Sequence, residues 1–198
     1  MQAGINLVSL EECGEIMGLQ RLREFLGSFS CPLNPEVEGY LTDLSKAYQS
    51  SLMSSSVTFL ALDAATGDLL GYFTLMMKSY SVRVSDLNSR NRRLVTRFSE
   101  IDASGNVSAA VYLIAQIGKN FAVAKSRQIA GATLLELAMD QFRKTRKTIG
   151  GKLVMVERES DRPKLLDFYT KNGFKSWTTR RNATDGMVYD QMFAILGD

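Results

Sequence analysis

The alternation of apolar runs and amphipathic helices in the second half of the chain restricts the fold more than any other feature. The order is strand, helix, strand, helix, strand, strand, over residues 109–117, 129–144, 152–157, 163–171, 174–178 and 187–195. A strand–helix–strand unit of this kind places its two strands parallel, with a right-handed crossover. The pattern therefore predicts an α/β protein whose sheet contains a parallel pair.

The first half of the chain supplies helices and an antiparallel hairpin. Helical spacing and strand alternation predict two helices and then two strands, over residues 10–26, 36–52, 57–62 and 69–76. Gly71 lies inside the second strand, which indicates a bulge or a close approach of another backbone. Residues 81–108 are the least regular, and we expect a solvated connection or a short helix there, with a basic patch that faces RNA or CoA as the alternative. The sheet is expected to be mixed, within a single domain over residues 1–198.

The chain contains no histidine, and this excludes whole classes of catalytic site. Ser-His-Asp catalysis, Cys-His catalysis and the common histidine-containing zinc sites all require that residue. The two cysteines, Cys13 and Cys31, are too few for a disulfide framework, and no metal is expected. Any general acid or base has to be a tyrosine, a carboxylate, a lysine, a cysteine, a chain terminus or water.

Hydropathy and charge set weaker limits. No apolar stretch approaches the roughly 18 residues that a membrane span needs, and the first residues lack the pattern of a secretory leader. We therefore expect a cytoplasmic protein with reduced thiols and no membrane partner. The net charge of +3 is compatible with an anionic ligand or RNA but diagnostic of neither.

Several small residues stand together at the predicted start of the helix that follows the strand 109–117, and such a segment is suited to binding phosphate. In Ile129-Ala130-Gly131-Ala132-Thr133 the short side chains leave the backbone open, and Lys125 and Arg127 stand just before it. Free N–H groups at a helix start point outward and carry partial positive charge. Close packing of a helix against a sheet explains such small residues equally well, so this feature alone is not diagnostic.

A second candidate site is the stretch LLDFYTKNGFKSW. Ser160-Asp161 followed by Pro163 predicts a helix start with a capping acceptor. Helical geometry turns Phe168 and Tyr169 about 100° apart, so we expect Phe168 in the core and Tyr169 along the sheet surface. Tyr169 is then either an amphipathic residue with a wet hydroxyl or a general acid that protonates a leaving thiolate.

Together, the strand–loop–small-residue helix and the motif Phe168-Tyr169-Thr170-Lys171-Asn172-Gly173-Phe174 resemble the GCN5-related N-acetyltransferases (GNAT). The resemblance covers residues 57–195. It implies a mixed, mostly antiparallel central sheet with flanking helices, in which the strand 111–117 splays from its parallel neighbour at 152–157. Segments in the first half, such as VEGYLTDLSKAYQSS, are similar in spacing to the GNAT subfamily of toxins that acetylate aminoacyl-tRNA.

The resemblance also implies roles for particular residues. Acetyl-CoA is the expected co-substrate, Tyr169 the general acid at its sulfur, and a backbone N–H at Ile117 or Gly118 the group that polarises the thioester. Glu157, or alternatively Glu159, is either a proton relay through water or part of a solvated strand end. The expected cofactor-binding residues are Ile117, Gly118, Lys125, Arg127, Gln128, Ile129, Ala130, Gly131, Ala132 and Thr133.

The phosphate loop departs from the family pattern Gln/Arg-x-x-Gly-x-Gly/Ala. Counted back from the paired leucines of the helix, Gly131 matches the last glycine, whereas Ile129 replaces the first and Ser126 replaces the Gln/Arg. A β-branched residue does not readily adopt positive φ. The loop is therefore expected either to follow another path, helped by the polar residues before the helix, or to bind CoA weakly.

Three functions stay open. An N-acetyltransferase acting on a small-molecule or protein amine is favoured. A toxin-like acetyltransferase acting on charged tRNA is the second, and it would need several arginines to gather on one face, namely Arg90, Arg92, Arg93, Arg143 and Arg146. The third is a GNAT-fold binding module that has lost turnover. Exposed strand edges in a mixed sheet also make a homodimer an expected assembly.

Overall fold

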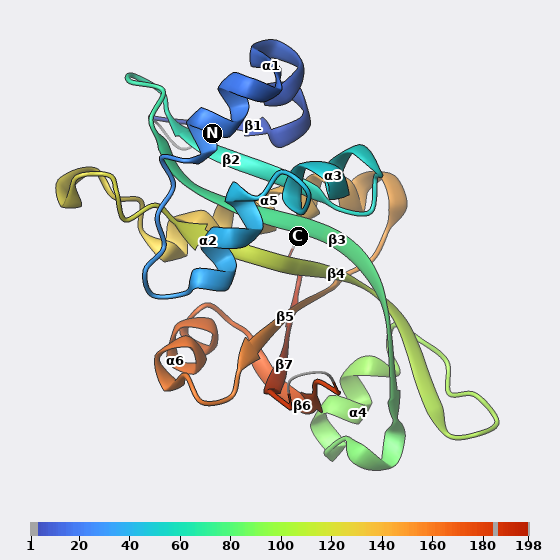
Figure 1. Ribbon diagram of the computed structural model, residues 1–198. Coiled ribbons are helices and arrows are strands. Elements are labelled where there is room, and N and C mark those ends of the chain that lie inside the picture. Colours follow the sequence, from blue (N-terminus) through green and yellow to red (C-terminus); the bar gives the residue numbers. More distant parts are fainter. Residues whose placement is uncertain (1–3, 184–185, 198) are drawn as a thin grey trace. The chain divides into compact units, whose positions relative to one another are not determined.

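The computed structural model describes residues 4–183 and 186–197, and Figure 1 labels the elements in this range. The chain separates into two compact units. The first comprises Met1–Met76 and Ile114–Asp140, and the second comprises Met77–Leu113 and Gln141–Asp198. The division falls within two strands and one helix, so these elements contribute residues to both units.

The strands form a seven-stranded sheet in the order β1-β2-β3-β4-β5-β7-β6. Their bounds are β1 Ile5–Ser9, β2 Val57–Asp63, β3 Leu69–Arg83, β4 Asn106–Lys119, β5 Leu153–Glu159, β6 Lys175–Arg181 and β7 Val188–Ile195. The sheet is mostly antiparallel and contains one parallel pair. The predicted α/β class with a mixed sheet is therefore confirmed. Strand β1 was not predicted, because five residues before a helix give too short an alternation.

Within the described ranges, six α-helices accompany the sheet. Their bounds are α1 Leu10–Leu26, α2 Pro35–Thr42, α3 Ala47–Leu52, α4 Ser89–Val95, α5 Gly131–Ile149 and α6 Pro163–Lys171. Helix α1 has the predicted bounds, but it is kinked at Gly18, whose backbone angles are not helical. It starts with a capping box, in which the Ser9 side chain and the Glu12 carboxylate satisfy each other's backbone N–H groups. The predicted single helix over 36–52 is wrong: Asp43 is extended and accepts from Ser45, and this turn separates α2 from α3.

In the first unit, helices α2 and α5 cover opposite faces of strand β3. The Gly71 Cα faces Leu134 of α5, and a Cβ there would lie 3.1 Å from the Leu134 side chain. The next residue, Tyr72, faces the other way and donates its hydroxyl to the Val37 carbonyl of α2 at 2.6 Å. A Cβ on Gly71 would also lie 2.8 Å from the Gly118 carbonyl oxygen. The predicted close approach at Gly71 is therefore confirmed.

In the second unit, the outer ends of β3 and β4 extend into the region that was expected to be irregular. Strand β3 continues to Arg83 and β4 begins at Asn106, with helix α4 between them (Figure 1). Tyr80 explains part of this order, because its ring packs edge-on against Phe193 at 4.7 Å and its hydroxyl lies 2.9 Å from the Thr178 hydroxyl. The arginine-rich sequence thus forms a short helix attached to a strand pair, which bears out the short-helix alternative for part of this region.

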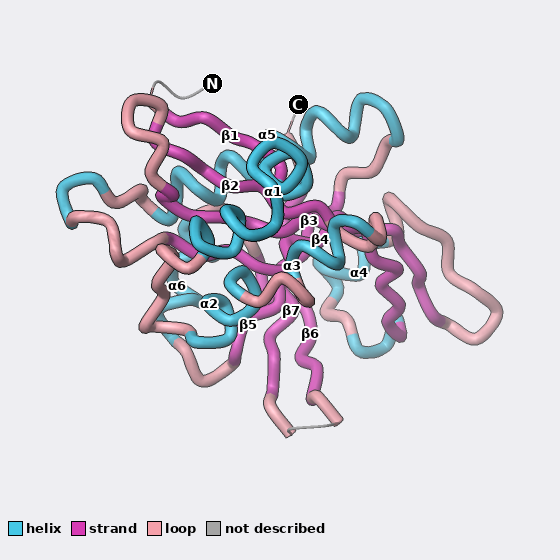
Figure 2. The backbone as a smooth tube through the Cα atoms, turned by 45° about the horizontal axis from the view of Figure 1, so that its top comes forward, coloured by secondary structure: helices cyan, strands magenta, loops and turns pink. Residues whose placement is uncertain are grey.

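Strands β5, β7 and β6 complete the second unit, and Figure 2 shows β6 and β7 as neighbouring magenta strands. The β6 register shifts between Ser176 and Thr178, so Trp177 is an extra residue, and its ring stacks on Phe193 at 4.2 Å. The predicted capping acceptor of α6 is wrong. Its first flanking residue, Arg162, makes no side-chain cap, and the Ser160 hydroxyl instead donates to Asp190 at 2.6 Å.

Candidate active site

The loop between β4 and α5 covers residues 120–130 and lies in the first unit. Strand β4 runs two residues past the predicted end at Ile117, and α5 begins two residues after the predicted start at Ile129, so the loop has the predicted length but lies two residues further along the chain. Among the described residues, Ser54 is the only non-glycine with positive φ, so Ile129 does not adopt the left-handed conformation. Its side chain is buried instead. Ile129 thus anchors the loop in the core and can offer only its backbone to a ligand, while the choice between another loop path and weak CoA binding stays a prediction.

Helix α5 begins without a side-chain cap. The Ala130 carbonyl accepts the first helical hydrogen bond from the Leu134 N–H at 3.1 Å, and an alanine side chain has no acceptor to offer. In the described part of the chain, the N–H groups of Gly131, Ala132 and Thr133 have no hydrogen-bond acceptor. These three donors, with the positive end of a 19-residue helix, form a surface suited to an anion.

The start of α5 at Gly131 also suggests a different alignment of the phosphate motif. Counted from Gln128 rather than Ser126, the pattern Gln/Arg-x-x-Gly places Gly131 at its fourth position, where the helix begins. Only the sixth position then departs, because Thr133 stands where glycine or alanine is usual. Ile129 is no longer a replacement of a conserved glycine in this alignment, which agrees with its buried, unstrained conformation.

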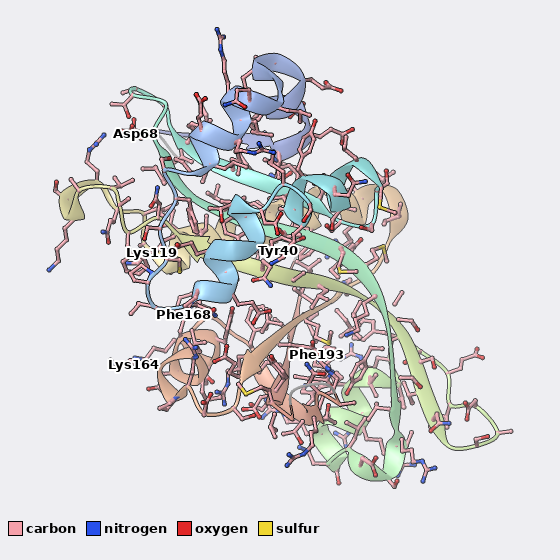
Figure 3. All side chains as sticks on the ribbon, viewed as in Figure 1. Tyr40, Asp68, Lys119, Lys164, Phe168 and Phe193 are labelled. Carbon is pink, nitrogen blue, oxygen red and sulfur yellow. The ribbon has the colours of Figure 1, made fainter. Side chains whose placement is uncertain are left out.

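The polar residues predicted to help hold phosphate differ in whether other protein groups already bind their side chains. Arg127 pairs with Asp68 on the β2–β3 turn at 2.5 Å (Figure 3 labels Asp68). The Gln128 side chain donates to the Val123 carbonyl at 3.1 Å, and this bond within the loop stabilises it. Lys125 is exposed and has no ion-pair partner among the described residues. Lys125 is therefore the predicted cation that remains available to a ligand.

One cation near the loop was missed. The Lys119 ammonium at the end of β4 lies 4.6 Å from the Phe121 ring centroid and 3.4 Å from the Gln128 side-chain oxygen. The predicted strand end at Ile117 leaves Lys119 inside the loop, where the sequence alone gives it no role. A longer estimate of the strand would have placed it at the loop entrance.

Gly118 is a packing position. A Cβ there would lie 2.5 Å from Val37 Cγ1, which is closer than side chains tolerate, and 3.2 Å from Phe29 Cζ, which is a tight contact. Glycine at this point lets helix α2 lie against the end of β4, and the Tyr72 hydroxyl holds the helix there. Ile117, the other predicted backbone donor, is half-buried. The structure thus gives Gly118 a packing role, whereas a role of either backbone N–H at a thioester stays a prediction.

In the second unit, the burial of the two aromatic residues of helix α6 is the reverse of the prediction. Tyr169 is 6% exposed, whereas Phe168, which Figure 3 labels, is half-buried. The Tyr169 ring lies between Phe168 and Phe174, with centroid distances of 5.1 Å and 5.5 Å and edge-on geometry. The reason is the turn at Gly173, which returns the chain so that Phe174 packs on the tyrosine side of the helix.

Burial changes the acidity of Tyr169. Loss of solvent around the ring and hydroxyl disfavours the phenolate and raises the pKa of Tyr169 to about 12. Among the residues that the structure describes, none hydrogen-bonds to its hydroxyl. The group is therefore a protonated donor at neutral pH with no protein acceptor, which is the state that a general acid requires.

Glu157 is held in place by three neighbours. Arg180 donates to both carboxylate oxygens at 3.1 Å and 3.0 Å, Gln191 donates at 2.8 Å, and the Lys78 ammonium lies 3.6 Å away. Partial burial raises the pKa of Glu157, but the hydrogen bonds and the two cations outweigh it, so the pKa lies below its usual value. A carboxylate stabilised in this way is a weak base. The geometry therefore favours neither of the two predicted roles, which were a solvated strand end and a proton relay.

The arginines are divided between a free group and an engaged group. Five exposed arginines have no ion-pair partner among the described residues: Arg83, Arg90, Arg92, Arg93 and Arg97. They lie on and around α4. Arg143 and Arg146 belong to α5 and have other interactions, and Arg146 donates to the Leu196 and Gly197 carbonyls at 3.4 Å and 3.3 Å. The predicted five-arginine surface is thus only partly assembled in the second unit.

Comparison with known proteins identifies the fold. No protein-family model matches the chain, and no curated protein sequence matches it. The structure of AtaT complexed with acetyl-methionyl-tRNAfMet has a TM-score of 0.62 and 15% identity, and covers 93% of each chain. AtaTR bound with AcCoA has a TM-score of 0.58 and 15% identity, over 95% of this chain and 93% of that one.

A third similar structure is a chimera of the spermidine N-acetyltransferase SpeG from Vibrio cholerae and hSSAT. Its TM-score is 0.54 at 14% identity, over 98% of this chain and 96% of that one. At such identities the likeness establishes the fold, so the chain has the GNAT fold, as the sequence predicted. Within the described residues, no helix is long and apolar enough to cross a membrane, and no cluster of three acidic or cysteine side chains could hold a metal.

Proposed function

We propose that this protein is an acetyl-CoA-dependent N-acetyltransferase that moves an acetyl group directly to a primary amine. The observation that carries the proposal is the start of α5, where three backbone N–H groups without acceptors in the described part of the chain follow the central strand of a GNAT fold. Such a helix start suits the pyrophosphate of CoA. The similar AtaTR structure, bound with AcCoA, supports the same co-substrate.

Each of the two units, taken by itself, has residues that fit this co-substrate. In the first unit, the N–H groups of Gly131, Ala132 and Thr133 would bind phosphate oxygens, and the exposed Lys125 would add a positive charge. The buried Ile129 and the internal bonds of Gln128 would keep the loop in place for them. In the second unit, Tyr169 offers an O–H group with no protein acceptor among the described residues.

In the transfer step, the nitrogen of the acceptor amine attacks the thioester carbonyl carbon. The C–N bond forms, the C–S bond breaks, and the departing thiolate takes the proton of the Tyr169 hydroxyl. The raised pKa of Tyr169 keeps that proton in place until the thiolate appears. The nitrogen loses its extra proton to water, because Glu157 is tied to cations and is a poor base.

Titration calorimetry with acetyl-CoA tests the proposal directly. Gly131→Arg places a long side chain over the free N–H groups and should weaken binding by at least about tenfold, or 1.4 kcal/mol. Thr145→Arg is the matched control, since it adds the same side chain at an exposed position near the other end of the same helix. The control should bind as the wild type does.

Either of two results would contradict the proposal. Absence of acetyl-CoA binding by the wild type removes the co-substrate. Tight binding without release of free thiol, across a panel of primary amines, would point instead to a binding module that has lost turnover. Retained binding in Gly131→Arg would remove the helix start as the phosphate site, whatever the activity.

A second candidate function is acetylation of aminoacyl-tRNA. The five exposed arginines around α4, unpaired within the described residues, favour it, because phosphate contacts dominate the affinity for nucleic acids. The similarity to AtaT complexed with acetyl-methionyl-tRNAfMet supports it as well. Expression should then arrest growth, and Tyr169→Phe should relieve the arrest. Normal growth of cells that contain the fully active enzyme would contradict this function.

A further inference from the structure

Asn120 follows the last residue of β4, and its side chain is almost fully buried, at 2% exposed. The side-chain oxygen accepts hydrogen bonds from the backbone N–H groups of Ser30 and Ala122, both at 3.0 Å. The side-chain nitrogen donates to the carbonyl oxygens of Leu69 at 2.9 Å and Ser28 at 3.2 Å. The amide thus uses both its acceptor and its donors, and only one orientation of the group satisfies all four partners.

These four bonds join three segments of the first unit that are distant in sequence. They are the turn after α1, the start of β3 and the loop that leads into α5. A backbone bond from the Phe121 N–H to the Ser30 carbonyl at 2.8 Å reinforces the contact between the turn and the loop. From the other side, the Glu38 carboxylate of α2 accepts from the Cys31 N–H at 2.5 Å and from the Ser30 hydroxyl at 3.2 Å. The turn is therefore held between α2 and Asn120.

We infer that Asn120 is a positioning residue that fixes the path of the loop into α5 and couples it to the turn Ser28–Cys31. The inference rests on the proposed function, in which the first turn of α5 holds the CoA phosphates. Asn120 is enclosed by protein groups, so it acts on the ligand through the loop and makes no contact of its own. A ligand that orders the loop also orders the turn after α1, because one buried side chain serves both segments.

The chemistry of the four bonds makes asparagine difficult to replace. Alanine would leave two N–H groups and two carbonyl groups without partners, and unpaired buried groups destabilise a protein. Aspartate keeps the shape and the accepting oxygen, but places a second oxygen against the Ser28 and Leu69 carbonyls. Protonation of that carboxyl would restore one donor, and burial favours the protonated form. The effect of Asn120→Asp should therefore depend on pH, whereas loss of a packing contact would not.

Hydrogen exchange measures the coupling without any assay of activity. At pH 8, Asn120→Asp should exchange faster than the wild type in both the turn 28–31 and the loop 121–128, by about tenfold or more. At pH 6 the difference from the wild type should shrink in both segments together. Thr58→Val is the matched control, because it removes a buried side-chain bond of 2.8 Å to Thr74 in the same unit.

Titration calorimetry then links this coupling to the ligand. Asn120→Asp should bind acetyl-CoA about tenfold more weakly than the wild type at pH 8 and approach it at pH 6, while Thr58→Val binds normally at both. In the wild type, acetyl-CoA should slow exchange in the turn 28–31 as well as in the loop. Wild-type exchange in either segment of folded Asn120→Asp, or an equal effect of Thr58→Val, would overturn the inference. Failure of the wild type to bind acetyl-CoA would instead overturn the proposed function, and the exchange result would still decide the positioning role.

Discussion

The loop before α5 and the helix α6 are ordered by different forces. Besides the buried Ile129 at its end, the loop is held by polar groups: the Asn120 amide, the Gln128 amide and the ion pair of Arg127 with Asp68. Helix α6 is held by aromatic rings, since Tyr169 is packed edge-on between two phenylalanines. In each region the group left without a protein partner among the described residues is a hydrogen-bond donor.

The difference has a physical basis in the two ligand groups that the proposal assigns. A pyrophosphate offers several oxygen acceptors in fixed positions, so the donors that bind it must be fixed as well, and hydrogen bonds are directional. A departing thiolate needs one proton from a group that stays neutral, and apolar packing supplies that state by raising the pKa of Tyr169. Changes in the loop should therefore act on binding, and changes at Tyr169 on turnover.

The largest effect is expected from Tyr169→Phe, which removes the proton donor and keeps the packed ring. The turnover number with any amine acceptor should fall by about 100-fold, the lower range for loss of a general acid. The dissociation constant for acetyl-CoA should stay within about twofold of the wild type. Thiol release under saturating acetyl-CoA measures the first quantity, and calorimetry measures the second.

Phe168→Leu is the matched control for this variant, because it changes the half-buried neighbour on the same helix and leaves the hydroxyl in place. It should retain most of the turnover. If Tyr169→Phe turned over normally, α6 would have only a structural role, and the contrast between a binding region and a chemical region would disappear.

The next effect concerns stability in the first unit. Gly118→Ala would place a Cβ 2.5 Å from Val37 Cγ1, and a β-branched side chain cannot easily move aside. We expect the free energy of unfolding to fall by about 2 kcal/mol. Gly39→Ala is the control, because Gly39 lies on α2, the helix that carries Val37, and nothing lies within 4 Å of a Cβ at Gly39. This variant should raise the free energy of unfolding by up to about 1 kcal/mol. Urea denaturation of both variants measures the two changes, and equal effects would show that Gly118 has no special packing role.

The sequence predicted the order of most elements, because helices and strands have distinct periods that need no tertiary information. It could not predict which member of the Phe168–Tyr169 pair is buried. Helical geometry fixes the angle between the two residues, but the buried side depends on Phe174, which returns after the turn at Gly173. The split of α2 from α3 was missed for a local reason, the side-chain bond from Asp43 to the Ser45 N–H.

The candidate site shows the same limit more sharply. The small-residue start of α5 could be recognised because Ile129 to Thr133 are consecutive. Asn120 could not, since its partners Ser30 and Leu69 lie 90 and 51 residues away in sequence. Gln128 was visible, but the first alignment gave it no defined position in the phosphate motif. Consideration of both possible alignments of the motif would have found its correspondence with Gly131.

A smaller effect is expected from Glu157→Gln in the second unit. Its carboxylate has a lowered pKa in the folded protein, so it stabilises the fold above the pKa of the unfolded chain, and this contribution is lost as the pH falls through the folded pKa. The variant should lose about 1 kcal/mol of the free energy of unfolding at pH 7, since Arg180 and Lys78 are partly exposed and screened. Below pH 4 the difference from the wild type should shrink.

Turnover separates the two roles of Glu157. Glu157→Gln should retain at least about a third of the wild-type turnover number, because the proposed mechanism gives the carboxylate no proton to carry. Thermal unfolding at pH 7 and pH 3.5, beside thiol release at pH 7, measures both predictions. A loss of 100-fold in turnover without loss of stability would identify Glu157 as the base after all.

The smallest expected effect is a turnover number that does not fall as the pH is raised to 10. Tyr169 is active in its protonated form, and an ordinary tyrosine would begin to lose its proton near pH 10. Because burial raises the pKa of Tyr169 to about 12, the protonated form should persist through pH 10. The turnover number, measured at saturating acceptor amine, should therefore stay level between pH 8.5 and pH 10 and show no basic limb in that range. A fall centred near pH 10, absent from Tyr169→Phe, would mean that water reaches the hydroxyl during catalysis, and the contrast between a polar loop and a dry aromatic helix would then hold only for the free protein.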